Sequence, residues 1–360
     1  MVSSDFPYKV GGSLAWNDPS YLKRPADFAL QTALSKRQFA YVLGPRQMGK
    51  SSLRVQAVHQ VAQLGGRCVS VQATQLHSDD ERDFLYVLYT ELVSDDLDRF
   101  LQWLALTEAL SMVERLVRFV DDFLADLLSV SDVVVFVDEI DALLETPLNS
   151  VLFSWMTKCY ELRSSAPRYR RLNFVVLGSV IASDLPCSGV LLPQGCEVLI
   201  SPFQLVETDV LKAGFEKRLD APDVLMAAIY RWTKGQPFLT QKLCRTVLGV
   251  MDSLVLPSAK PIQLSSRVVN QWVDDVVRSH IIQDWQTQDE PIHLRAISRR
   301  INESYNKKAL FQLYKTIFLG KSVKANGSYT QAELILSSLV SVEGDYLQVA
   351  NEIYRSIFQI

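Results

Sequence analysis

The sequence lacks a long apolar run, an excess of charge of one sign and a signal peptide, and each absence narrows the possible functions. No stretch approaches the roughly 18 to 20 apolar residues that cross a bilayer, and the first residues lack a basic segment followed by an apolar core. The net charge of −3 gives no general electrostatic attraction to nucleic acid or to an anionic membrane. The sequence therefore predicts a cytoplasmic protein without a membrane partner.

The cysteine content also excludes a disulfide framework. The five cysteines are an odd number and have no Cys-x-x-Cys or Cys/His spacing of the kind that binds metals. We therefore expect buried free thiols in a reducing compartment. A content of 48% hydrophobic and 21% charged residues is typical of globular proteins, and 360 residues suffice for two or three domains. The cysteines are Cys68, Cys159, Cys187, Cys196 and Cys244.

What the chain does contain is a glycine-rich phosphate-binding pattern. An apolar run ends at Gly44, and residues 44–51 then have the G-x-x-x-x-G-K-S spacing of a P-loop. Gly44 and Gly49 let successive backbone N–H groups point at phosphate oxygens, and a helix beginning near Lys50 adds its positive end. We expect Lys50 to reach the β- and γ-phosphates and the Ser51 hydroxyl to bind Mg²⁺. An ordinary glycine turn is the alternative. The other loop residues expected at the nucleotide are Pro45, Arg46, Gln47, Met48 and Ser52.

A second pattern places two acids after a buried strand. Residues 133–137 are continuously apolar, as in a central parallel strand buried on both faces, and Asp138 and Glu139 follow them. This is the Walker B pattern. We expect Asp138 to hold the Mg²⁺ shell beside Ser51, and Glu139 to polarise the water that attacks the γ-phosphate. The alternative is that the two acids simply begin a helix.

Three further features have both a functional and a structural interpretation. Arg24, before the first strand, either lies near the nucleotide or is a solvated arginine at a helix start. Ser179, after the apolar strand at 174–178 and with Ser183 behind it, is either a sensor of the γ-phosphate or a plain loop residue. The basic cluster before that strand either supplies an arginine finger to a neighbouring subunit or is solvated. Its members are Arg163, Arg168, Arg170 and Arg171.

The hydrophobic pattern predicts strands in the first half and helices in the second. Strands are expected before Gly44 and at 67–73, 133–137, 174–178 and 197–200, with helices at 81–128. Helices are then expected at 207–218, 222–233, 238–250 and 266–285. Pro237 lies between two of these, where it can begin a helix and offer a flat apolar surface to an adenine.

The last segment predicts a winged helix. Helices are expected at 292–305, 309–318 and 330–339, and two short strands across a glycine turn follow them. Winged helices often bind DNA, and this is the most basic part of the chain, with Arg295, Arg299, Arg300, Lys307 and Lys308. However, the third helix would be the recognition helix, and its charged residue is the acid Glu333. That argues against reading of the major groove.

Together these residues resemble the AAA-like domain of bacterial, notably cyanobacterial, STAND-type signalling ATPases, which are signal-transduction ATPases with numerous domains. The similarity runs from about residue 10 to residue 358. The motif around Gly235-Gln236-Pro237 and the run Asn351–Tyr354 are more specific to this family than a P-loop is. The matching motifs are residues 21–27, 46–53, 135–141, 232–244 and 351–354.

The resemblance implies an α/β fold: a P-loop ATPase sheet flanked by helices, then a helical lid and a winged helix that together clamp ATP or ADP with Mg²⁺. It implies a closed ADP state and an ATP state that self-associates. It also implies that Pro237 touches the base and that Arg24 lies near the nucleotide. The expected domains are a lead-in at 1–20, the P-loop domain at 21–203, the lid at 204–288 and the winged helix at 289–360.

The leading expectation is therefore an ATP-binding switch with slow Mg²⁺-dependent hydrolysis. It would work with a protein partner, or with a sensor or effector domain. One alternative is an AAA+ ATPase of the remodelling or transposition type, which would act continuously on protein or DNA. Another is a DNA-binding regulator that uses the winged helix. A kinase is the weakest alternative, since nothing resembles a lid for an acceptor substrate.

Overall fold

The structure is a computed structural model that describes residues 6–76, 82–186, 194–254 and 261–359. The chain forms two compact units. The sheet unit comprises residues 25–44 and 53–200. The helical unit comprises the N-terminal residues up to Arg24, residues 45–52 of the P-loop, and the chain from Ser201 onwards. The P-loop is thus grouped with the C-terminal helices, although the strand that leads into it belongs to the sheet unit.

The sheet unit contains five parallel strands in the order β2-β3-β4-β1-β5. The P-loop strand β1 pairs with β4, and β4 pairs with the acid-bearing strand β3. Because all strands are parallel, the carboxyl ends of β1, β3 and β4 lie at one edge of the sheet. The strands are β1 (Ala40–Leu43), β2 (Arg67–Gln72), β3 (Val133–Asp138), β4 (Leu172–Gly178) and β5 (Cys196–Glu197).

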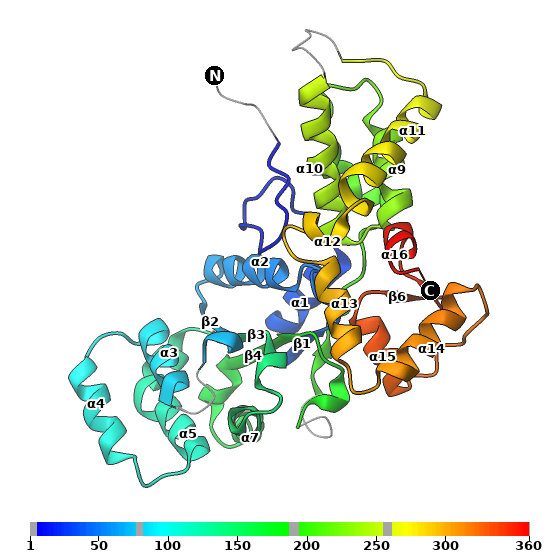
Figure 1. The fold of residues 1–360 in the computed structure, drawn as a ribbon. Helices are drawn as coiled ribbons and strands as arrows, with labels where there is room; N and C mark the ends of the chain where they lie inside the picture. The colour runs from blue at the N-terminus through cyan, green and yellow to red at the C-terminus, as the bar shows by residue number, and fades with distance from the viewer. Residues whose placement is uncertain (1–5, 77–81, 187–193, 255–260, 360) are drawn as a thin grey trace. The chain divides into compact units, whose positions relative to one another are not determined.

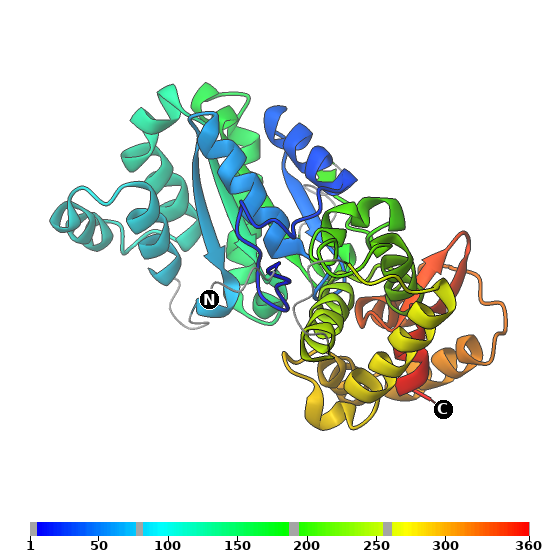
Figure 2. The same ribbon diagram turned by 90° about the horizontal axis from the view of Figure 1, so that it is seen from above.

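Helices cover both faces of this sheet, as Figures 1 and 2 show. On one face, Val134 and Phe136 pack against α1 (Pro25–Ser35) and α2 (Lys50–Gln63). On the other face, Val133 and Val135 pack against a larger helical layer. Every residue of β3 is buried, which explains its continuously apolar sequence. The larger layer consists of α3 (Arg82–Leu92), α4 (Leu97–Leu106), α5 (Met112–Phe123), α6 (Ala125–Val130) and α7 (Pro147–Leu162).

The helical unit is built around a single apolar core. Its larger helices are α9 (Pro222–Thr233), α10 (Pro237–Leu254) and α11 (Ser266–Val277), with α13 (Leu294–Glu303), α14 (Lys307–Phe318) and α15 (Tyr329–Leu336) after them. The antiparallel strands β6 (Val340–Glu343) and β7 (Tyr346–Val349) and the helix α16 (Glu352–Ile357) complete it. The helical C-terminal region expected from the sequence is therefore present, and its assignment as a lid and a winged helix stays a prediction.

The N-terminal segment also belongs to this core. Tyr8 and Val10 are buried in it. The Tyr8 ring stacks on Phe215 at 5.4 Å, and its hydroxyl donates a hydrogen bond to the Leu211 carbonyl. Burial raises the pKa of this hydroxyl, so it stays protonated as a donor. The lead-in expected at residues 1–20 thus contributes to packing from Tyr8 onwards.

Three elements differ from the sequence prediction. The fifth strand spans Cys196–Glu197 instead of 197–200, since it pairs only with β1 and a proline follows at position 202. The region 207–218 forms a 3₁₀ turn and the short helix α8 (Asp209–Lys212). The region 266–285 changes to a π-helical turn at Arg278–Ile282. There the Ser279 hydroxyl donates to the Asp275 carbonyl, a local bond that competes with the helix ladder.

The cysteine prediction is correct in part. Cys159 and Cys244 are buried free thiols, and burial raises the pKa of each. Cys68 and Cys196 are free but only half-buried. Cys187 lies outside the described residues.

Candidate nucleotide-binding site

The P-loop lies between β1 and α2, and its backbone uses left-handed conformations. Gly49 has φ of +88°, and Gln47, which carries a side chain, has φ of +59°. At Gly49 a Cβ atom would lie 2.9 Å from Nη2 at the end of the Arg24 side chain. The left-handed φ is thus the stronger reason for the second glycine of the motif.

Lys50 is folded back over the loop that precedes it. Its Nζ donates a 2.6 Å hydrogen bond to the Pro45 carbonyl, and the residue is 8% exposed. Charge-assisted hydrogen bonds from an ammonium group to phosphate are stronger than a hydrogen bond to a neutral carbonyl, so the expected phosphate contact of Lys50 stays a prediction. Ser51, the predicted Mg²⁺ ligand, is half-buried at the start of α2.

Arg24 is buried against the P-loop and is not a solvated arginine. It is 2% exposed, and its Nη1 donates to the carbonyls of Met48 at 2.9 Å and Ser201 at 3.1 Å. The guanidinium lies 5.3 Å from the centroid of the Phe203 ring. Arg24 thus ties the loop to the start of the C-terminal part of the chain. Its contact with a nucleotide stays a prediction.

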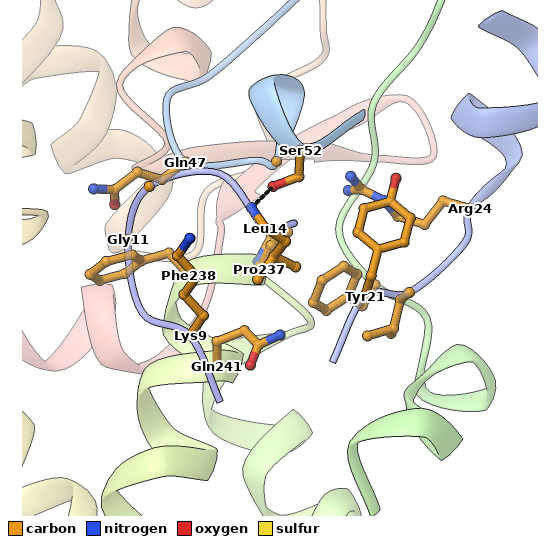
Figure 3. A pocket seen from close by; sticks show the side chains of 14 residues that line it. Lys9, Gly11, Leu14, Tyr21, Arg24, Gln47, Ser52, Pro237, Phe238 and Gln241 are labelled. Atoms are coloured by element: carbon orange, nitrogen blue, oxygen red, sulfur yellow. Dashed lines mark hydrogen bonds between the residues drawn. The ribbon is translucent and has the colours of Figure 1, made fainter. Parts of the chain in front are cut away.

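A cavity of about 90 Å³ brings several predicted residues together (Figure 3). Arg24, Gln47, Gly49, Ser52 and Pro237 line it. Small-molecule sites usually measure about 300 to 1,000 Å³, so this cavity is too small for a whole nucleotide in the conformation described. The cavity lining also includes residues that were not predicted as site residues from the sequence. Among them are Lys9, Gly11, Leu14, Tyr21, Phe238 and Gln241.

The N-terminal segment closes one side of this cavity. The backbone N–H of Leu14 donates a 3.0 Å hydrogen bond to Oγ of Ser52, drawn as a dashed line in Figure 3. Gly11 and Gly12 have φ of +79° and +68°, and a Cβ at Gly11 would lie 3.0 Å from the Pro291 ring. The paired glycines were the available signal in the sequence, because two adjacent glycines permit such a bend beside another segment.

In the sheet unit, Asp138 ends β3 and forms an ion pair that the sequence did not reveal. Its Oδ2 lies 3.2 Å from Nε of Arg54, and the two side chains are 5% and 12% exposed. Its Oδ1 accepts a 3.0 Å hydrogen bond from the backbone N–H of Glu139. Both carboxylate oxygens are therefore oriented by neighbours within the same unit.

Glu139 has an unusual backbone conformation. Its φ of +59° and ψ of +41° are left-handed, which costs roughly 1 to 3 kcal/mol for a residue with a side chain. Such residues cluster at functional sites, where the surrounding structure holds them in place. The Glu139 side chain is exposed, and its Oε2 accepts a 2.8 Å hydrogen bond from the Thr74 hydroxyl. Thr74 lies in the turn Ala73–Gln75 that follows the neighbouring strand β2.

Ser179 is connected to the same loop. It follows β4 and is 5% exposed, and its backbone N–H donates a 3.0 Å hydrogen bond to Oδ1 of Asp141. At Gly178 a Cβ would lie 2.4 Å from Cγ2 of Ile140, so the chain passes this loop too closely for a side chain. Ser183 is exposed in the turn Ala182–Asp184. The sensor role of Ser179 stays a prediction.

Most of the basic cluster is held in contacts within the chain. The Arg163 guanidinium donates to the carbonyls of Arg37 and Leu172, at 2.7 Å each, and burial lowers its pKa. Arg168 forms a 3.0 Å ion pair with Asp121. Nε of Arg170 donates to the Arg163 carbonyl at 2.9 Å. These contacts give a structural role to three of the four arginines, and an arginine finger among them stays a prediction.

The donor set fits Mg²⁺ as it is bound beside phosphates. Mg²⁺ prefers hard oxygen ligands and keeps several waters, so that one or two protein ligands suffice next to a substrate phosphate. Asp138 supplies a buried carboxylate, and Ser51 a hydroxyl. In the described part of the chain, no group of three His, Cys, Asp or Glu side chains could hold a metal ion by itself. Ser51 belongs to the helical unit and Asp138 to the sheet unit, so a Mg²⁺ site shared by the two stays a prediction.

The motifs at residues 232–244 and 351–354 both contact His293, which was not predicted as a functional residue. His293 lies 4.6 Å from the Phe238 ring between centroids, and its Nε2 is 2.6 Å from the Tyr354 hydroxyl. The backbone N–H of His293 donates to the buried Asp289 carboxylate, and Lys242 lies 3.8 Å from the same carboxylate. Burial lowers the pKa of His293 from 6.5 to about 3, so the ring is neutral at pH 7.

Comparisons with known proteins agree with this architecture. A Walker-type ATPase of Pyrococcus abyssi superposes with a TM-score of 0.57 at 15% identity, covering 98% of this chain and 99% of that one. The ORC2 protein of Aeropyrum pernix, in its ADPNP–ADP complexes, superposes with a TM-score of 0.50 at 16% identity, covering 97% of each chain. At this identity the likeness concerns the fold, which is that of P-loop ATPases.

A relative from a cyanobacterium is closer in sequence. A WD repeat-containing protein of Synechocystis sp. is 34% identical over 361 aligned positions, which cover 98% of this chain. The chain spans about 30% of the length of that relative. Among the described residues, no helix is long and apolar enough to cross a membrane. The sequence also matches the family described as the AAA-like domain over residues 10–251. The chain therefore belongs to the AAA-like domain family.

Proposed function

We propose that this protein is an adenine-nucleotide switch: it binds ATP with Mg²⁺, hydrolyses it slowly, and couples the bound nucleotide to self-association or to a partner. The main support for the proposal is the cavity of Figure 3. It is lined both by P-loop residues and by the first two residues of α10. These are Gly49 and Ser52, and Pro237 and Phe238. A ligand held by both would link the P-loop to the C-terminal helices, whose core includes Phe238.

Binding of the phosphates would begin with Lys50. Its ammonium would leave the Pro45 carbonyl, which it reaches at 2.6 Å, for the stronger charge-assisted bonds to phosphate oxygens. Ser51 and Asp138 would supply oxygen ligands to Mg²⁺, which when bound neutralises charge that develops on the phosphates. Arg24 would stabilise the conformation of the P-loop through its hydrogen bond to the Met48 carbonyl.

Hydrolysis would depend on Glu139. Its carboxylate would accept hydrogen bonds from the attacking water and orient it. The hydrogen bond from Thr74 engages Oε2 and leaves Oε1 for that water. Slow turnover agrees with a carboxylate acting as general base, because general-base catalysis by itself contributes only about 10² to 10⁴ in rate.

Nucleotide binding would control self-association or the binding of a partner. A nucleotide shifts an equilibrium only by its differential affinity for two conformations. The cavity of about 90 Å³ is smaller than a nucleotide needs, so ligand entry would have to displace the segment that includes Leu14. We propose that this displacement alters the surface offered to a second copy or to a partner domain, such as the WD repeats for which the Synechocystis relative is named.

The rate of ATP turnover distinguishes a switch from a continuously acting ATPase. We expect slow steady-state turnover, limited by hydrolysis or by release of ADP, that a DNA duplex leaves unchanged. Stopped-flow release of a fluorescent ADP analogue and a coupled ATPase assay measure both rates. Rapid turnover stimulated several-fold by duplex DNA would instead support a remodelling or transposition-type ATPase.

A further inference from the structure

A second and larger cavity lies beside the P-loop in the helical unit. It measures about 690 Å³, within the range of about 300 to 1,000 Å³ typical of small-molecule sites. One wall is formed by Arg46 and Gln47 of the P-loop, and another by α13. The turn after α15, at Ser337 and Ser338, contributes a third wall. The volume is several times that of the cavity of Figure 3.

The lining of this cavity is strongly basic in a chain that carries a net charge of −3. Four arginines and one carboxylate, that of Glu303, line it, and Arg295 is also paired outside the lining with Glu290, whose Oε1 lies 2.7 Å from its Nη2. The ring of His293, also in the lining, adds no charge at neutral pH because burial lowers its pKa to about 3. The four are Arg46, Arg295, Arg299 and Arg300. Such a concentration of guanidinium groups favours an anionic ligand.

The helix α13 arranges this charge on one side. Positions 295, 299 and 303 are four residues apart, so their side chains lie above one another on the helix surface. Nε of Arg299 lies 3.2 Å from Oε2 of Glu303, and the two side chains are 78% and 67% exposed. An ion pair so exposed contributes little stability. An incoming phosphate can therefore replace Glu303 as the partner of Arg299 at small cost.

We propose that this cavity binds a small phosphorylated molecule that carries at least two phosphate groups, at a position distinct from the one expected for the nucleotide phosphates at Lys50 and Ser51, which do not line it. Guanidinium groups form bidentate hydrogen bonds with phosphate oxygens, and several of them in one cavity select for more than one phosphate. The volume admits a nucleotide-sized ligand. The proposal does not depend on whether the protein hydrolyses ATP.

Gln47 gives this second site a direct connection to the first. It lines both cavities. Its side-chain Nε2 donates to the Ile292 carbonyl at 3.0 Å, and its backbone carbonyl accepts a hydrogen bond from the Gln236 side chain at 3.3 Å. A ligand that moves α13 relative to Gln47 would change the P-loop, and by linkage a nucleotide in the P-loop would change the affinity of the second site.

The test is calorimetric titration of pyrophosphate into the Lys50→Ala protein, in which the P-loop can no longer hold phosphate through its lysine. We expect saturable binding that becomes ~10-fold or more weaker in Lys50→Ala with Arg299→Ala and Arg300→Ala added, because charge-assisted hydrogen bonds are lost. Glu303→Gln should tighten binding, since it releases Arg299. The matched control is Lys307→Ala with Lys308→Ala, which removes two exposed charges of the same region outside the cavity.

Three outcomes would overturn the proposal. One is the absence of saturable pyrophosphate binding, both in Lys50→Ala and in the wild-type protein saturated with Mg-ADP. Another is an equal loss in the Lys307→Ala/Lys308→Ala control, which would indicate non-specific attraction. The third is binding of a short DNA duplex that depends on Arg299 and Arg300 while pyrophosphate does not bind, which would make this surface a nucleic-acid interface. Circular dichroism of each variant checks that it is folded.

Discussion

The two units carry different halves of the predicted chemistry. The residues that would hold a nucleotide, among them Lys50 and Pro237, belong to the helical unit. The acids expected to act in hydrolysis belong to the sheet unit, where Asp138 ends β3 opposite Gln72 of β2 and Glu139 follows it. In the proposed function, binding would require a cavity of about 90 Å³ to open, whereas hydrolysis would use carboxylates at the end of β3. We therefore expect mutations to separate binding from hydrolysis.

The largest expected effect is a loss of ATP affinity. Lys50→Ala should weaken ATP binding by at least ~100-fold, because the charge-assisted bonds of a buried ammonium to phosphate are lost. Titration of a fluorescent ATP analogue measures this. Lys36→Ala, which removes an exposed lysine, is the control and should bind as the wild type does. Micromolar affinity retained by Lys50→Ala would remove the P-loop assignment.

The next effect concerns the hydrolysis side alone. Glu139→Gln should bind ATP with unchanged affinity and hydrolyse it about 10² to 10⁴ times more slowly, since a neutral amide cannot act as the base. Single-turnover assays with radiolabelled ATP separate chemistry from product release. Glu145→Gln, an exposed glutamate a few residues further along the chain, should leave the rate unchanged. If turnover of Glu139→Gln matched the wild type, another group would have to activate the water.

A smaller effect is expected at Pro237, the first residue of α10. Pro237→Ala should release bound nucleotide about tenfold faster, because the loss of two ring methylenes removes apolar contact worth about 0.8 kcal/mol each. Stopped-flow release of a fluorescent ADP analogue measures the rate. Pro222→Ala is a matched control, since Pro222 also begins a helix of this unit but does not line the cavity. Equal release rates in both variants, at equal thermal stability, would reduce Pro237 to a helix start.

The smallest effect concerns stability rather than function, and it is confined to the helical unit. His293 is neutral when folded, with its pKa lowered by burial from 6.5 to about 3. Below pH 6.5 the unfolded chain binds a proton at His293 that the folded chain does not bind. Each further fall of one pH unit, down to about pH 3, therefore lowers the free energy of unfolding by about 1.4 kcal/mol. His293→Gln should lack this contribution. Denaturant midpoints of the two proteins should therefore converge between pH 7 and pH 5, and parallel curves would contradict the burial argument.

The sequence was sufficient where its signals are local. The strand at Val133–Asp138 and the loop at 44–51 were predictable because an apolar run, a glycine spacing and a pair of acids each sit within ten residues. The helix Pro222–Thr233 was predicted with its observed bounds. Its proline at the first position explains this, since a proline fits a helix start and fixes where the helix begins.

The sequence was insufficient where function depends on partners far apart in the chain. Arg54 pairs with Asp138 across 84 positions, and Leu14 reaches Ser52 across 38. No periodicity or motif encodes such pairs, because they arise only when the chain is folded. His293 was missed for the same reason, since its partners Phe238 and Tyr354 lie in two separate motifs. The strained backbone of Glu139 likewise became visible only in the structure.

The most direct test of the switch is the solution mass of Glu139→Gln by light scattering, with Mg-ATP and separately with ADP. This variant should hold ATP without consuming it, so each nucleotide state persists through the measurement. We expect a monomer with ADP and a defined larger oligomer with ATP. The same mass in both states would contradict a switch that works through self-association.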